Sequence, residues 1–216
     1  MARVFITGSS DGLGLLAAQL LVQQGHSVVL HARNEQRARE AMTAVPGAQK
    51  AVIGDLSSIA QTRSVADQVN GLGSFDAVIH NAGVGYRESR RIETDDGLPH
   101  VFAVNTLAPY ILTALIHKPK RLMYLSSGLH QSGDASLKDL AWREVHGAGS
   151  RHIRIPSCTM CFWRLRSRGC GLMSFRMLSS PDGSQRKWVE RALRTISSRG
   201  TRRRHGLPSV RTRVRG

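Results

Sequence analysis

Hydrophobic and polar positions in the first two-thirds of the chain form two alternating kinds of segment. Short runs rich in β-branched residues, such as RVFITG at 3–8 and SVVLHAR at 27–33, are apolar on both faces, as in strands buried inside a parallel sheet. Longer segments between them carry apolar residues on one helical face. The pattern predicts strands at 3–8, 27–33, 51–55, 75–80 and 121–127, and helices at 12–24, 34–45, 58–69 and within 94–117.

This alternation predicts an α/β fold, a doubly wound parallel sheet with helices on both sides, because crossovers between parallel strands are right-handed. Ligands of such sheets bind beyond the carboxyl ends of the strands, where the strand order reverses. We therefore expect the site to lie after residues 8, 33, 55, 81 and 127. The alternation stops at Glu144. We expect the sheet to be incomplete on its C-terminal side, with strand 121–127 as an unpaired edge.

Composition and charge divide the chain at the same place. Its 216 residues are 41% apolar and 21% charged, three cysteines exclude a disulfide scaffold, and no apolar run could span a membrane. From Arg151 onward, 16 Arg and one Lys face only Asp182 and Glu190, so +15 of the net charge of +16 lies there. We predict a folded domain at 1–143 and a basic, disordered or out-of-frame tail at 144–216. The N-terminus has no signal-peptide layout, so a cytoplasmic location is expected.

The segment TGSSDGLG at 7–14 joins the first predicted strand to the first predicted helix. Glycines let the backbone turn tightly and approach a diphosphate, whose charge the N–H groups of a helix N-terminus can bind. The segment therefore favours dinucleotide binding; the alternative is an ordinary strand-to-helix turn.

The spacing TGxxxGxG resembles the short-chain dehydrogenase/reductase family, and further motifs match that family in order. Asp55 in GDL resembles its adenine-contacting aspartate, NAG at 81–83 the motif that braces the sheet, and Asn105 in FAVN the helix asparagine that holds a relay water. Ser127 of the pair 126–127 matches the catalytic serine. Singly, Asp55 could cap a turn, Asn105 could be a surface residue, and Ser127 could start a loop.

The resemblance covers residues 1 to about 143 and implies a Rossmann-type oxidoreductase that moves a hydride between a nicotinamide cofactor and a carbonyl or alcohol substrate. It implies catalytic roles for Asn105 and Ser127. The expected cofactor-binding residues are Gly8, Ser10, Gly12, Leu13, Gly14, Arg33, Asp55, Leu56, Asn81, Ala82 and Gly83. No metal, specific nucleic acid or membrane partner is expected, and the oligomeric state is not predicted.

Arg33 indicates which nicotinamide cofactor binds. In dinucleotide folds, an acidic residue near the end of the second strand contacts the ribose 2′-hydroxyl, whereas an arginine suits a 2′-phosphate. The sequence HARN at 31–34 has no acid and offers the Arg33 guanidinium. We therefore expect NADP in preference to NAD; the alternative is a solvated arginine at the start of a helix.

The family's chemistry requires a Tyr and a Lys four residues apart, and this pair is absent from the sequence. Tyr86, Tyr110 and Tyr124 have no Lys four residues later. Read two bases later, degenerate codons for 152–157 permit YSDSK, and those for 180–188 permit PGWVATKM, which resembles the family's motif after strand six. We hypothesise that a frameshift near 143–151 replaced the native C-terminal part; an intact reading frame in the resequenced DNA would exclude it.

The missing pair predicts that catalysis by this chain is impaired, and two other functions remain open. The chain could be a non-catalytic NAD(P)-binding remnant or, less favoured, a nucleic-acid-binding protein acting through Arg202, Arg203, Arg204 and His205. Cys158, Cys161, Cys170 and His152 superficially offer metal ligands, but one CxxC without a second ligand pair is a weak signal.

Overall fold

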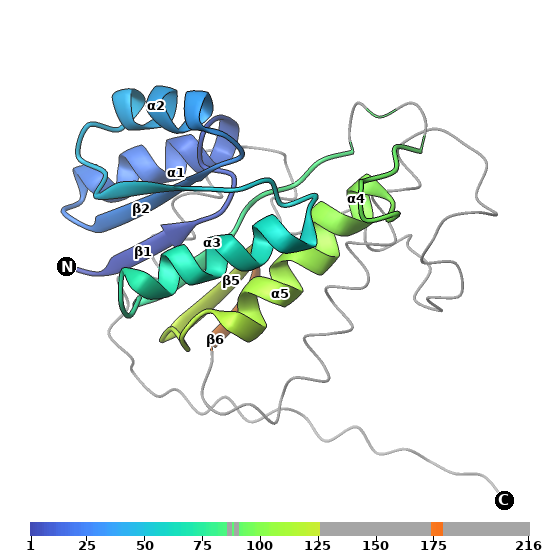
Figure 1. Ribbon diagram of the computed structural model, residues 1–216. Helices are drawn as coiled ribbons and strands as arrows, with labels where there is room; N and C mark the ends of the chain where they lie inside the picture. Colours follow the sequence, from blue (N-terminus) through green and yellow to red (C-terminus); the bar gives the residue numbers. More distant parts are fainter. Residues whose placement is uncertain (86–87, 89–90, 126–173, 179–216) are drawn as a thin grey trace, which may run out of the picture.

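A six-stranded parallel sheet forms the centre of the molecule (Figure 1). The computed structural model describes residues 1–85, 88 and 91–125, together with the backbone of 174–178. The strands are β1 (Arg3–Ile6), β2 (Ser27–Ala32), β3 (Lys50–Ile53), β4 (Ala77–His80), β5 (Arg121–Leu125) and β6 (Ser174–Leu178). Their order is β3-β2-β1-β4-β5-β6, so the doubly wound sheet is confirmed and its direction of winding reverses between β1 and β4.

The helices lie where the apolar periodicity predicts them, with ends set by identifiable residues. They are α1 (Gly12–Gln23), α2 (Glu35–Ala44), α3 (Ile59–Gly71) and the consecutive segments α4 (His100–Phe102), η1 (Ala103–Leu107) and α5 (Ala108–Leu115). The Asn34 side chain accepts the Arg37 N–H at 2.9 Å and caps the start of α2. The last helix, expected within 94–117, begins directly after Pro99.

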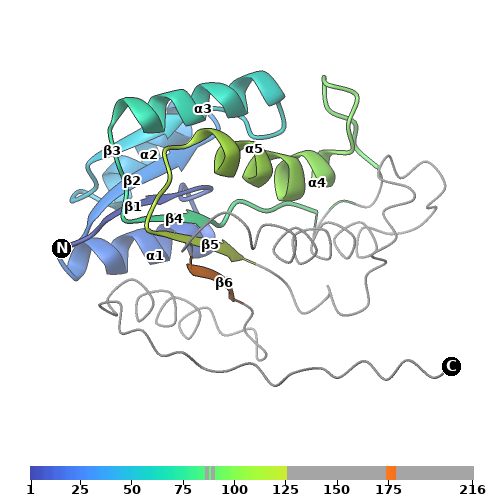
Figure 2. The same cartoon turned by 90° about the horizontal axis from the view of Figure 1, so that it is seen from below.

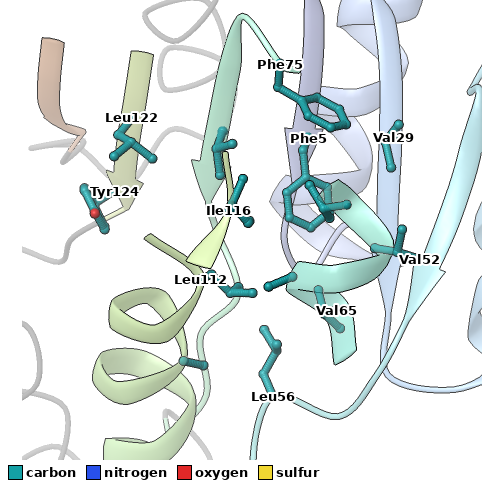
Figure 3. Close-up of a cluster of buried hydrophobic side chains, with 14 of the residues drawn as sticks. Phe5, Val29, Val52, Leu56, Val65, Phe75, Leu112, Ile116, Leu122 and Tyr124 are labelled. Atoms are coloured by element: carbon teal, nitrogen blue, oxygen red, sulfur yellow. The ribbon is translucent and has the colours of Figure 1, made fainter. Parts of the chain in front are cut away.

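Alternate side chains of strands β1 to β5 enter two separate hydrophobic layers. Val4 and Ile6 of β1 pack in the layer that contains α1 and α2 residues, whereas Phe5 enters the layer formed with α3 and α5. Figure 2 shows α1 on one side of the sheet and α3 and α5 on the other. In Figure 3, Val65 and Leu112 from these helices lie over the strand residues of the second layer. Both faces are therefore covered, as apolar strands require.

The expectation that the fifth strand forms the sheet edge is wrong. β6 pairs with β5 in parallel, from Arg121 opposite Ser174 to Leu125 opposite Leu178. Residues 126–173 are more than enough for a parallel crossover, which needs about a dozen residues. SFRML lies in the segment predicted to be a tail, where no surrounding periodicity marks a strand. The remainder of 144–216 lies outside the described residues.

No helix in the described part of the chain is long and apolar enough to cross a membrane.

Candidate functional site

The loop after β1 and the beginning of α1 are packed too closely for a side chain at Gly8 or at Gly14. Gly8 has φ 60°, and a Cβ there would lie 2.8 Å from the Ala82 Cα. A Cβ at Gly14 would lie 2.3 Å from the Gly8 carbonyl oxygen and 2.5 Å from Asn81 Nδ2. Both distances are shorter than van der Waals contact, so the loop can approach the segment after β4 only because these residues are glycines.

The start of α1 is open to solvent at Gly12. Gly12 has φ 52°, and outside its chain neighbours and the helix's own backbone no heavy atom lies within 4 Å of the position that its Cβ would take. The N-cap residue, Asp11, makes no side-chain hydrogen bond to the helix, because its carboxylate instead pairs with Arg37 of α2. Backbone N–H groups at this helix end therefore have no side-chain cap, and the helix dipole there favours an anion. The open approach and the donors fit a diphosphate group.

Asn81 joins the loops that follow β1 and β4. Its Nδ2 donates to the Thr7 and Gly8 carbonyl oxygens at 3.0 and 2.8 Å. In return, Thr7 Oγ1 accepts the backbone N–H groups of Asn81 and Ala82 at 3.0 and 3.1 Å. Four hydrogen bonds thus hold the two loops together where the strand order reverses, the position expected for a ligand.

Asn105 lies in a π-helical turn and is fastened to the segment after β4. Its Oδ1 accepts the Val84 N–H at 2.9 Å, and its Nδ2 donates to the Val84 carbonyl at 3.0 Å. Ala108 donates to the Ala103 carbonyl, five residues back. Pro109 has no N–H, so the Asn105 carbonyl lacks the donor that an α-helix supplies four residues later. Such π-turns often occur at functional sites.

Three predicted cofactor-binding residues follow β2 and β3: Arg33 follows β2, and Asp55 and Leu56 follow β3. Arg33 is exposed directly after β2, without a hydrogen bond or ion pair to any residue in the described ranges. Asp55 is half-buried after β3, where its Oδ1 accepts the Ser57 N–H at 2.8 Å, and Leu56 is buried. The Asp55 backbone N–H donates to Gln61 Oε1 at 2.9 Å, which fixes this loop against α3.

The structure places the predicted residues of four loops at the carboxyl ends of β1, β2, β3 and β4. Ser10 and Leu13 lie in or beside the loop after β1, and Ala82 and Gly83 follow Asn81. Ser126, Ser127 and the residues weighed as metal ligands or as a nucleic-acid contact lie outside the described residues. Among the described residues, no group of three or more His, Cys, Asp or Glu side chains could hold a metal ion.

Tyr124 is buried and contacts Thr113 and His80. Its hydroxyl lies 2.6 Å from Thr113 Oγ1, and burial raises its pKa to about 12, although the Thr113 bond acts in the opposite direction. Its ring stacks on His80, with centroids 4.8 Å apart, and burial lowers the pKa of His80 to about 3. This group of side chains lies in the hydrophobic layer with α5 and stabilises the packing there.

Sequence reasoning missed two site residues, Ser9 and His31. Both are buried and hydrogen-bonded to each other at the ends of β1 and β2. A histidine inside the apolar run SVVLHA was the available signal, because a buried imidazole requires hydrogen-bonding partners. The partners themselves come from distant segments and could not be read from the sequence.

Comparison with known proteins gives independent matches to this chain. A family model described as short chain dehydrogenase matches residues 2–125. An uncharacterized oxidoreductase of Emericella nidulans is 56% identical over 154 residues, covering 70% of this chain and 60% of that protein. The chain therefore spans about 60% of this relative's length.

Solved structures show the same fold. An uncharacterized protein from Mycobacterium paratuberculosis has a TM-score of 0.76 at 22% identity, covering 93% of this chain and 78% of its own. A short-chain dehydrogenase from Sphingobium yanoikuyae, solved in complex with NADPH, has a TM-score of 0.65 at 18% identity, covering 89% of this chain and 83% of its own.

Proposed function

Because this chain belongs to the short-chain dehydrogenase family, we propose that it binds a nicotinamide dinucleotide and derives from an enzyme that reduces carbonyls or oxidises alcohols. The observation that carries this proposal is the loop from Gly8 to Gly14. It combines an unobstructed helix start with glycine contacts too close for any side chain. The residues present therefore fit the group that the family implies.

The cofactor's diphosphate would lie against the first turn of α1, held by backbone N–H groups of the loop. Asn81 keeps this loop in place through its two bonds to Thr7 and Gly8. Asp55 and Leu56, at the end of β3, would bind the adenine side. Ala82 and Gly83 would line the path toward the nicotinamide.

We propose NADP as the preferred cofactor on the basis of Arg33. Its exposed guanidinium follows β2 without a partner in the described ranges, and can form a charge-assisted pair with a 2′-phosphate. The NADPH complex of the similarly folded Sphingobium yanoikuyae enzyme supports the cofactor class. NAD binding in such folds uses an acidic residue at this position to contact the ribose 2′-hydroxyl, and the positively charged Arg33 stands there instead, which argues against NAD.

The bound cofactor would supply or accept the hydride. Asn105, clamped to Val84 through both side-chain atoms, would place its backbone carbonyl for a relay water. Ser127 would hydrogen-bond the substrate oxygen. In the family the tyrosine of the Tyr–Lys pair is the proton donor, and no tyrosine in this sequence has a lysine four residues later. We therefore expect this chain to turn over substrate roughly 10²–10⁴-fold more slowly than family enzymes that have the pair.

A titration of the full chain with NADP⁺ and NAD⁺ tests cofactor binding. We expect the wild type to bind NADP⁺ more tightly than NAD⁺. Arg33→Ala should lower the affinity for NADP⁺ about tenfold or more, because one charge-assisted bond is lost, and should leave the affinity for NAD⁺ nearly unchanged. Arg39→Ala, which removes an exposed charge from α2, the helix that follows Arg33, is the matched control and should change neither affinity. Binding of neither dinucleotide by folded protein would refute the proposal.

A second candidate is a dinucleotide-binding protein without catalysis, which the absent Tyr–Lys pair favours. It predicts an NADPH-dependent rise in melting temperature with no consumption of NADPH in the presence of aldehydes or ketones. Turnover comparable to that of family enzymes with the Tyr–Lys pair would exclude it.

For the oxidoreductase function, we propose a small-molecule carbonyl or alcohol as the substrate and the cytoplasm as the location.

A further inference from the structure

His31 connects three strand ends through its two ring nitrogens. It lies in β2 and is only 3% exposed. The Gly8 N–H donates to His31 Nδ1 at 2.9 Å, and His31 Nε2 lies 2.9 Å from the Gly54 carbonyl oxygen. An amide can only donate and a carbonyl can only accept, so Nδ1 must be the unprotonated nitrogen and Nε2 must carry the hydrogen.

Ser9 strengthens the same connection through the backbone. The His31 N–H donates to Ser9 Oγ at 2.8 Å, and that hydroxyl donates to the Ile6 carbonyl at 3.0 Å. The Ser9 N–H donates to the His31 carbonyl at 3.1 Å. Because Ser9 is fully buried, these bonds are shielded from water and hold the end of β2 against the glycine loop.

These contacts determine the orientation of the two peptide units on either side of Gly8. The Gly8 N–H is bound by His31 and is therefore not available to a ligand, and the Gly8 carbonyl oxygen accepts from Asn81 Nδ2 at 2.8 Å. The bonds hold Gly8 in its left-handed conformation, which turns the chain toward the open first turn of α1. The other end of the imidazole holds Gly54, the residue before Asp55.

We propose that His31 is a positioning residue for dinucleotide binding, joining the loop that would hold the diphosphate to the β3 end that would hold the adenine. This role rests on the proposed cofactor function. It requires a neutral ring, and burial lowers the pKa of His31 to about 4, although the Gly54 bond and the Asp55 charge act in the opposite direction. At neutral pH, Nδ1 therefore keeps the lone pair that accepts the Gly8 N–H.

Titration of full-length variants with NADP⁺ and with ADP tests the role. His31→Leu removes both hydrogen bonds of the imidazole and should lower the affinity for both nucleotides about tenfold or more. ADP is included because it carries the diphosphate and the adenine. His31→Gln keeps an acceptor and a donor at similar separation and should recover most of the affinity. His80→Leu, which alters another buried strand-end histidine with no bond to the loop, should leave both affinities within about twofold.

Nitrogen NMR of the nucleotide-free wild type provides a second readout that does not depend on variant folding. We expect a neutral His31 protonated at Nε2 and a Gly8 amide that exchanges slowly with solvent. Protonation at Nδ1 would overturn the positioning role. Equal affinities of wild type and His31→Leu would overturn that role alone, whereas a wild type that binds neither nucleotide would overturn it together with the proposed function.

Discussion

Gly14 shows how a single hydrogen atom in place of a side chain permits the site to form. A Cβ at this position would meet the Gly8 carbonyl oxygen at 2.3 Å, and that oxygen is held by Asn81 and cannot move independently. We expect Gly14→Ala to displace the loop, lower the free energy of unfolding by about 1–3 kcal/mol and abolish measurable NADP⁺ binding. Denaturant unfolding and nucleotide titration measure the two effects.

The matched control at the residue scale is Gly71→Ala. Gly71 ends α3, and outside its chain neighbours and the helix's own backbone no heavy atom lies within 4 Å of the position that a Cβ would take there. Alanine favours helix over glycine by about 1 kcal/mol, so this variant should unfold at slightly higher denaturant concentration and bind NADP⁺ as the wild type does. If Gly14→Ala behaves like Gly71→Ala, the close contact is not what requires glycine.

At the scale of elements, the side-chain hydrogen bonds that cap the first turns of α2 and α3 differ in length. Asn34 accepts the Arg37 N–H at 2.9 Å, whereas Ser58 accepts the Gln61 N–H at 3.4 Å. We expect Asn34→Ala to lower the free energy of unfolding by about 1 kcal/mol and Ser58→Ala to lower it by less, because the longer bond contributes less. Urea midpoints of the two variants measure this order, and an equal or reversed order would contradict it.

At the scale of the whole molecule, two buried neutral histidines make stability dependent on pH. Burial lowers the pKa of His31 to about 4 and that of His80 to about 3, from 6.5. Between these values and 6.5 the unfolded chain binds more protons than the folded one, so stability falls as pH falls. The expected loss is roughly 2 kcal/mol per histidine between pH 7 and pH 5.

His80→Leu tests this pH dependence directly. The variant removes one titrating group and also a ring nitrogen, Nδ1, that has no hydrogen-bond partner within the described residues. Denaturant unfolding at pH 7 and pH 5 should show a smaller difference between the two pH values than the wild type shows. An unchanged difference would mean that His80 does not contribute to acid lability.

The local pattern of this sequence determined its elements and the nature of its main loop. Apolar runs and amphipathic segments placed β1 to β5 and the helices within a few residues, because burial on two faces or one imposes those periods. TGSSDGLG and NAG were recognisable because the backbone geometry at a tight turn restricts which residues fit it. Arg33 was predicted to contact the cofactor because its charge is visible in the sequence itself, and that role stays a prediction.

Only the tertiary structure decided which distant residues meet. β6 pairs with β5 across residues 126–173, and nothing local to SFRML specifies that partner. His31 reaches Gly8 and Gly54, each 23 positions away in sequence, and Asn105 reaches Val84. Strand pairing and buried hydrogen bonds depend on separations that close only when the sheet assembles, so the sequence specified the parts of the site, and the packing of the chain determined their contacts.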